Sequence, residues 1–273
     1  MATPEAPLRE ILKAISFTQF PLRINRSFFT PETIDSPQLY IHRPLTQKSS
    51  ASPSCDVKSM STLALLRFVG FKADIKYSSE PEASPNNQLP YLLLPDSLAL
   101  DARGIESHLR EQGVLGESEL ADEMVYLTMV ENNLIPVTEY LAWIDPEGFD
   151  SIGWQKYLGS YPMIVRYFLG WQKRLHTSRK LQTGLPEYGS ALDGDVIYEN
   201  AFRALDSLVV LLGERKYFSG IKPGVLDALV FACLNVIVEA PLKSPIRSAM
   251  TREGSKYKTL LDFTMRILEE YFQ

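Results

Sequence analysis

The chain has 273 residues, of which 45% are hydrophobic and 22% charged, as in an ordinary globular protein, so general disorder is excluded. Its net charge of −5 argues against a nucleic-acid binder, which needs a positive field. Two distant cysteines exclude a disulfide framework. The three histidines are scattered without a second ligand at metal spacing, so we expect neither a metal ion nor another cofactor.

No segment predicts a targeting leader or a membrane span. The first 15 residues carry Glu5 and Glu10 and lack a long apolar run, unlike a secretory signal or an acid-poor transit peptide. The most apolar run, residues 225–238, contains Asp227 and Asn235 and is shorter than the ~20 residues that cross a bilayer. We therefore expect a soluble chain whose membrane role, if it has one, is peripheral.

Residues 1–37 predict a short amphipathic helix followed by an extended arm. Apolar side chains recur there at helical spacing (Leu8, Ile11, Leu12 and Ile15). Residues 17–37 are rich in proline, threonine and serine, which favours an extended arm. A second polar, serine-rich stretch at 46–54 predicts a flexible loop.

Residues 38–115 predict a small α/β domain. A strand at 39–41 is followed by a helix at 55–70, for which Gly70 is a suitable stop. Alternating apolar residues then predict a strand at 71–77, a hairpin around the turn at 95–97, and a closing helix at 105–111. The order β-α-β, then β-β-α, is the thioredoxin-type arrangement of a mixed sheet with helices on its faces.

Residues 116–273 predict an all-helical domain, so the fold class is α/β plus all-α. A long helix at 124–143 contains Pro136, where we expect a kink. A helix is expected at 198–212, and residues 225–238 are apolar all round, which predicts a helix at the centre of the domain. The last helix has an apolar face along residues 257–271.

Three single residues have a structural and a functional interpretation. Pro90 is either an ordinary strand-start proline or a cis-proline at the edge of a thioredoxin-type sheet. Cys55 is either a lone cysteine or a thiol activated at a helix N-terminus, although Asp56 disfavours a thiolate. Asp227 lies three residues past the start of the buried helix, where a folding cap is expected and an acid catalyst is the alternative.

Residues 151–186 combine basic and aromatic side chains without any Asp or Glu. Six basic residues give this stretch a charge of +6, so the rest of the chain sums to −11 (−5 − 6). Such a mixture suits a membrane–water interface or an anionic partner. The alternative is that the rings belong to the core and the charges to a solvated face. The binding candidates are Trp154, Tyr157, Arg166, Trp171, Lys173, Arg174, Arg179 and Lys180.

The predicted order of elements resembles the glutathione transferase fold, a thioredoxin-like domain followed by helices. The resemblance is carried by residues 89–92 (LPYL) and 101–105 (DARGI). In active transferases an acid–serine pair at the Asp101–Ala102 position holds the γ-glutamyl group of glutathione. Ala102 stands at the serine position, so the resemblance extends to the fold and not to that hydrogen bond. A transferase or thiol-transfer enzyme that uses Cys55 is the alternative function.

A closer resemblance, over residues 39–272, is to the metaxin family. It is carried by 66–68 (LRF), 134–137 (LIPV), 143–145 (WID), 216–220 (KYFSG) and 226–231 (LDALVF), with the intervening residues Asp122 and Glu131. The resemblance implies a non-catalytic subunit of the mitochondrial sorting and assembly machinery, which inserts β-barrel proteins into the outer membrane. The expected type is the peripheral, unanchored subunit of fungi, which residues 8–22 also resemble.

The family resemblance also implies partners and a location. We expect a peripheral protein on the cytosolic face of the mitochondrial outer membrane. Its implied partners are an Omp85-type β-barrel subunit, an anchored metaxin-like subunit and the β-signals of β-barrel precursors. Nucleic acid is not among the expected partners.

Overall fold

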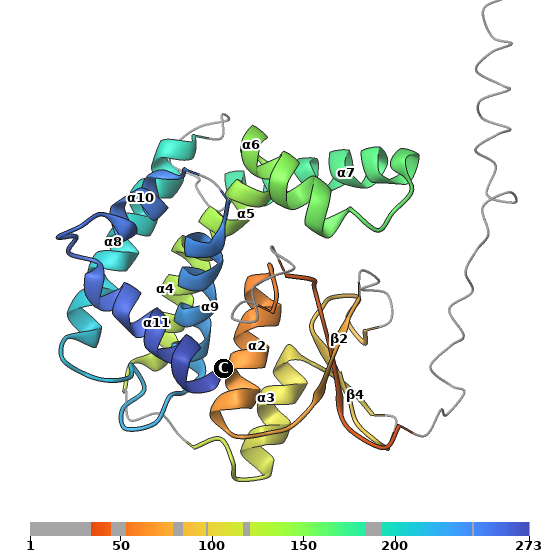
Figure 1. Ribbon diagram of the computed structural model, residues 1–273, viewed down its shortest axis with the longest axis vertical. Coiled ribbons are helices and arrows are strands. Elements are labelled where there is room, and N and C mark those ends of the chain that lie inside the picture. Colours follow the sequence, from red (N-terminus) through yellow and green to blue (C-terminus); the bar gives the residue numbers. More distant parts are fainter. Residues whose placement is uncertain are drawn as a thin grey trace, which may run out of the picture. The chain divides into compact units, whose positions relative to one another are not determined.

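The computed structural model describes residues 34–44, 53–78, 84–96, 98–116, 121–183, 193–241 and 243–272. These residues lie in one unit, Ile34–Gln273, whose fold is drawn in Figure 1. The expected N-terminal helix, the arm up to residue 33 and residues 46–52 of the loop expected at 46–54 lie outside the described residues.

Four strands of the described chain form one mixed sheet in the order β2-β1-β3-β4. β1 pairs parallel with β2 and antiparallel with β3, and β3 pairs antiparallel with β4. In this register Leu39 of β1 lies opposite Ile75 and Leu92. The predicted thioredoxin-type order is thus confirmed. The strands are β1 (Gln38–Ile41), β2 (Asp74–Tyr77), β3 (Tyr91–Leu93) and β4 (Ala99–Asp101).

Two helices accompany the sheet, and side-chain caps define where each begins. α2 (Val57–Phe68) begins at Asp56, whose carboxylate accepts the amide of the third residue on at 2.9 Å. Asp101 caps α3 (Ala102–Glu111) in the same way at 2.8 Å. α2 stops just before Gly70, as predicted, and the φ of +71° at Gly70 lies in the left-handed region that glycine adopts without strain.

The rest of the described chain is helical. The expected kink at Pro136 is a break between α4 and α5, and Pro136 occupies the first turn of α5, where a missing N–H costs nothing. The elements are α4 (Glu123–Asn133), α5 (Ile135–Trp143), α6 (Pro146–Gly148), the π-helix η2 (Phe149–Tyr157), α7 (Met163–Thr183), α8 (Gly194–Leu212), α9 (Val225–Glu239), α10 (Pro245–Thr251) and α11 (Lys258–Tyr271).

α9 lies at the centre of the helices, as its apolar sequence predicts. It packs along α2 on one side and against α4, α5, α10 and α11 on the others (Figure 1). Phe231 is fully buried, with its ring 5.2 Å from that of Phe272. α2 therefore lies between the sheet and α9 and contributes to the cores of both layers.

Asp227 has the structural role expected of a cap. Its buried carboxylate accepts the amides of Phe218 at 2.7 Å and of Ser219 and Gly224 at 3.0 Å. Burial raises the pKa of Asp227, and these donors oppose the rise because they stabilise the charged form. The carboxylate fastens the loop before α9 to the first turn of that helix.

Arg67 joins the sheet-bearing part of the unit to the last helix. Its guanidinium donates to the carbonyl oxygen of Tyr271 at 2.6 Å and lies 4.3 Å from the centre of the Phe272 ring. The neighbouring Phe68 ring meets Tyr271 edge-on at 4.8 Å. The LRF motif at 66–68 therefore sets how the end of α11 packs against α2.

Candidate interaction surface on α7

The basic and aromatic stretch folds into η2 and α7, which pack tightly against each other. Asp145 accepts the amide of Gly148 at 2.8 Å and so starts the turn that leads into η2. A Cβ at Gly153 would collide with the carbonyl oxygen of Ala142 in α5. A Cβ at Gly170 of α7 would lie 3.2 Å from the Phe149 ring. Small residues thus set the close contacts that hold α7 in place.

α7 carries a continuous row of exposed large apolar side chains, which we call the α7 face. Residues 163, 167, 171 and 175 follow one another at intervals of four, and residues 164 and 168 lie beside them, so all project from one side of the helix. Trp171 is 64% exposed and Phe168 is 59% exposed. The α7 face consists of Met163, Ile164, Tyr167, Phe168, Trp171 and Leu175.

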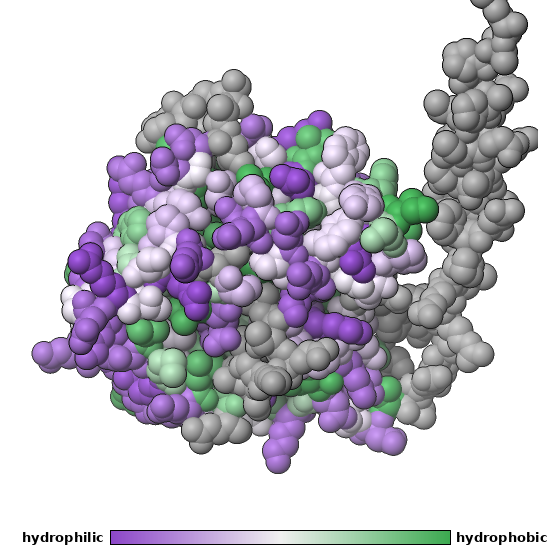
Figure 2. Space-filling view, turned by 45° about the horizontal axis from the view of Figure 1, so that its top comes forward, coloured by the Kyte–Doolittle hydropathy of each residue, from purple (hydrophilic) through white to green (hydrophobic). Residues whose placement is uncertain are grey.

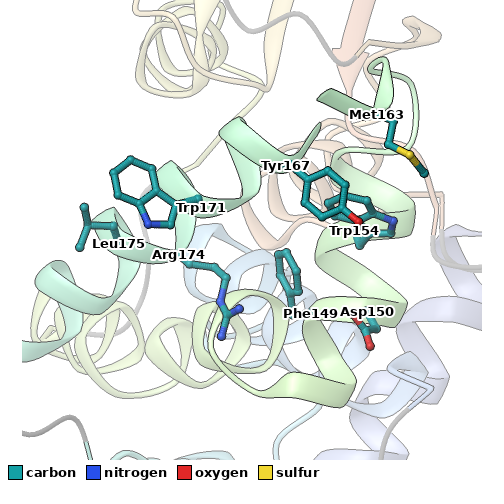
Figure 3. Close-up of a pocket in the computed structure, with 8 residues that line it drawn as sticks. All are labelled: Phe149, Asp150, Trp154, Met163, Tyr167, Trp171, Arg174 and Leu175. Carbon is teal, nitrogen blue, oxygen red and sulfur yellow. The ribbon is translucent and has the colours of Figure 1, made fainter. Parts of the chain in front are cut away.

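A groove of about 610 Å³ runs between the α7 face and η2 (Figure 3). Figure 3 shows Trp171, Tyr167 and Met163 along the α7 wall, with Phe149 and Trp154 opposite them. Trp154 packs on Tyr167 with ring centres 4.8 Å apart. The remaining lining residues are Asp150, Arg174 and Leu175.

In the space-filling view, green (hydrophobic) and pale (intermediate) residues reach the surface over the region of α7 (Figure 2). The sequence interpretation does not single out the α7 face as a set. The signal in the sequence that identifies it is the four-residue spacing, and in the structure the buried residues of α7 are Gly170, Thr177 and Leu181.

The structure brings four of the predicted binding residues to this surface: Trp154, Trp171, Arg166 and Arg174. The Arg174 guanidinium lies 4.8 Å from the centre of the Phe149 ring, and that of Arg166 lies 5.1 Å from Trp154. Arg166 also donates to the carbonyl oxygen of Gly159 at 2.6 Å. Arg174 lines the groove and is exposed, whereas Arg166 also holds the turn that precedes α7.

The other four candidates lie outside the groove, and of these Arg179 alone continues the line of the α7 face. Arg179 is exposed one turn beyond Leu175. Lys180 pairs with Glu139 of α5 at 2.6 Å, so its charge is locally balanced. Lys173 lies on another side of α7, close enough to His42 for its charge to contribute to lowering the pKa of that residue.

Tyr157, the remaining candidate, points inward to the start of α2. Its hydroxyl lies 3.3 Å from Asp56 and 3.5 Å from the carbonyl oxygen of Cys55, and its ring meets His42 edge-on at 4.9 Å. Burial raises the pKa of Tyr157 well above its usual range. Tyr157 therefore covers Cys55 and is not part of the exposed surface.

Cys55 is closed off from solvent. The residue is 2% exposed, and burial, reinforced by the charge of Asp56, raises the pKa of its thiol far above the usual value. A thiol in this state is protonated at neutral pH and is a poor nucleophile. Burial also lowers the pKa of the neighbouring His42, against the opposing effect of Asp56.

At the position that holds glutathione in transferases, the Asp101 carboxylate is hydrogen-bonded within the chain itself. Asp101 accepts the amide of Gly104 at 2.8 Å and the side-chain amide of Asn86 at 3.0 Å, and Ala102 offers no hydroxyl. The Leu89–Pro90 bond is cis, as predicted from the thioredoxin-type context. The described part of the chain brings together no three His, Cys, Asp or Glu side chains fit to hold a metal ion.

Comparison with known proteins shows the family to which the chain belongs. Residues 59–174 match the model of the outer mitochondrial membrane transport complex protein family (Tom37), and residues 201–267 match a glutathione S-transferase C-terminal domain. Mouse metaxin-1 is 28% identical over 229 residues, 81% of this chain and 71% of that protein. Mouse metaxin-2 is 25% identical, with 81% of this chain and 84% of that protein covered. The chain belongs to the metaxin family.

Solved structures confirm the fold of this metaxin. A glutathione transferase from Phanerochaete chrysosporium superposes with a TM-score of 0.55 at 12% identity, covering 88% of this chain and 98% of the other. The β-etherase LigF from Sphingobium gives 0.53 at 16% identity, covering 87% and 98%. The predicted glutathione-transferase-like fold, with a thioredoxin-like sheet and a helical part, is therefore correct.

Membership of the metaxin family gives the chain a role in transport at the outer mitochondrial membrane. Among the helices that the structure describes, none is both long and apolar enough to span a bilayer.

Proposed function

We propose that this metaxin is a non-catalytic, peripheral subunit of the machinery that inserts β-barrel proteins into the mitochondrial outer membrane. It lies on the cytosolic face, docks on an Omp85-type barrel subunit beside an anchored metaxin-like subunit, and helps to receive the β-signals of precursors. The division at residues 38–115 and 116–273 belongs to the same proposal, with the thioredoxin-like domain first and the helical domain second.

The observation that carries the proposal is the α7 face. A metaxin that served only as a free cytosolic scaffold would have no use for six large apolar side chains exposed along one helix. Such a surface costs solubility unless a partner covers it. Its basic neighbours and the family's outer-membrane role both favour attachment at that membrane.

Affinity isolation tests the proposal. The tagged full chain is recovered from outer membranes solubilised in mild detergent, and the proteins that accompany it are identified. We expect a β-barrel subunit of the Omp85 type and an anchored metaxin-like protein. A chain that comes out alone, and that fractionates with the cytosol, contradicts the proposal and supports the scaffold alternative.

The enzyme alternative depends on Cys55, and the closed thiol position counts against it. Tyr157 and Asp56 cover the thiol, and burial holds its pKa far above neutrality. In a glutathione-dependent thiol-transfer assay we expect the purified chain and its Cys55→Ser variant to give the same background rate. A rate above background that disappears in Cys55→Ser establishes the enzyme and overturns the non-catalytic proposal.

A further inference from the structure

We propose that the α7 face binds an anionic lipid surface directly, with α7 lying flat in the interfacial layer and its aromatic rings among the headgroups. This inference deepens the proposed function, on which it rests for the membrane concerned. It identifies the partner of the α7 face as lipid, and the experiments below distinguish lipid from a protein partner at the same face.

The dimensions of the α7 face suit a helix that lies in the plane of a membrane. From Met163 to Leu175 the helix rises by about 18 Å at ~1.5 Å per residue, so the row covers a little over three turns. The apolar side chains occupy one side only, and the buried residues Gly170, Thr177 and Leu181 face the molecule. One membrane surface can therefore cover the whole row at once.

The residue types of the α7 face are those of an interfacial helix. Tyr167 and Trp171 combine a large apolar ring with a polar atom, which favours the headgroup region over the hydrocarbon core. Met163, Ile164 and Phe168 supply apolar area that inserts below them. A rigid protein partner would instead need a shape to match this row.

Charge selects an anionic surface. α7 contains no acidic residue. Arg174 follows Trp171 by three residues and Arg179 follows Leu175 by four, so both lie along the α7 face. Neither arginine takes part in an ion pair within the part of the chain that the structure describes. Among the residues that line the groove, Asp150 alone is acidic.

A second group of exposed apolar side chains provides a comparison inside the same molecule. Met124 and Val125 are exposed in the first turn of α4, directly after Asp122 and Glu123. Acidic neighbours oppose an anionic membrane. The two apolar surfaces therefore differ in the charge around them, and of the two the α7 face has the sign that anionic lipid requires.

Vesicle binding tests the inference with lipid alone. The purified full chain is mixed with phosphatidylcholine vesicles with and without phosphatidylserine, and the bound fraction is measured by flotation. We expect binding to the anionic vesicles, with a blue shift of tryptophan emission as Trp171 leaves water. Trp171→Ala should weaken binding by roughly tenfold, since a large apolar side chain no longer inserts. Arg174→Glu should weaken it by at least about fivefold, the value of one basic charge near such a surface.

Two matched variants serve as controls. The double variant Met124→Ala/Val125→Ala removes exposed apolar area outside the α7 face, and Lys258→Glu makes the same change in net charge as Arg174→Glu at the exposed start of α11. Both should bind anionic vesicles like the unmodified chain. Equal weakening by these controls, or unchanged binding in Trp171→Ala and Arg174→Glu, overturns the inference.

Affinity isolation in detergent separates this inference from the proposed function. If Trp171→Ala no longer binds vesicles but still isolates with the barrel subunit, both the lipid inference and the subunit assignment hold. If the unmodified chain does not bind vesicles and Trp171→Ala no longer isolates with the barrel subunit, the α7 face binds protein and the lipid inference is wrong. If vesicle binding is as expected but no barrel subunit is recovered, only the proposed function fails.

Discussion

α9 and α7 are both rich in large apolar residues, yet the structure uses them in opposite ways. In α9, 12 of the 15 residues are buried, whereas α7 buries three of its 21. α9 is enclosed by α2, α4, α5, α10 and α11, while α7 packs on α5 and η2 along one side. The apolar surface of α9 therefore stabilises the fold, and that of α7 remains available to a partner. Four substitutions in and around these helices test this difference.

Phe231→Ala in α9 should have the largest effect. The ring is fully buried, so its removal leaves a cavity and costs about 3–5 kcal/mol in the free energy of unfolding. Urea denaturation followed by circular dichroism measures the loss. A cost below about 1 kcal/mol would mean that α9 is not the centre of the helical core.

Asp227→Ala at the start of α9 should come next. It leaves the amides of Phe218, Ser219 and Gly224 without their acceptor, at about 1–3 kcal/mol for each donor that stays buried. We expect a loss of roughly 3 kcal/mol or more by urea denaturation. Asp227→Asn keeps one acceptor oxygen, so its free energy of unfolding should lie between those of the unmodified chain and Asp227→Ala. A fully stable Asp227→Ala variant would contradict the capping role.

Tyr157→Phe should have a smaller effect, because its hydroxyl makes only long hydrogen bonds, at 3.3 and 3.5 Å. We expect a loss of about 1 kcal/mol, measured by the shift of the urea midpoint. The ring itself stays in contact with His42 and Trp143, so the start of α2 remains covered. A loss as large as that of Asp227→Ala would assign the hydroxyl a central part in joining η2 to α2.

Phe168→Ala in α7 should have the smallest effect on stability. It is the same chemical change as Phe231→Ala, but the ring is 59% exposed, and we expect a change within about 0.5 kcal/mol. The pair Phe168→Ala and Phe231→Ala thus compares the two helices directly. A cost of several kcal/mol for Phe168→Ala would show that the α7 face belongs to the core.

The sequence predicts α9 better than α7 for a physical reason. A helix that is apolar all round is stable in water only when it is buried. The central, buried position of residues 225–238 is therefore predicted correctly without knowledge of their neighbours. The hairpin, the break at Pro136 and the stop at Gly70 also follow from local backbone chemistry.

The candidate site depends on neighbours that local patterns do not specify. Between residues 151 and 186 the sequence alternates rings and basic groups, and the structure divides the rings between interior and surface. Tyr157 belongs to the interior, whereas Trp171 is exposed. η2 is a π-helix, so the side of it that faces α5 does not follow from a 3.6-residue period. Lys173 and Arg174 are adjacent in sequence but lie on different sides of α7.

Retention of a Phe168→Ala/Trp171→Ala double variant on isolated outer membranes is the most direct test of a partner-binding α7 face. The fraction in the membrane pellet is compared with that of the unmodified chain and of Met124→Ala/Val125→Ala, after circular dichroism has established that all three are folded. We expect the α7 variant to leave the pellet while the other two remain. Equal retention of all three would contradict the assignment of the α7 face as the surface of attachment.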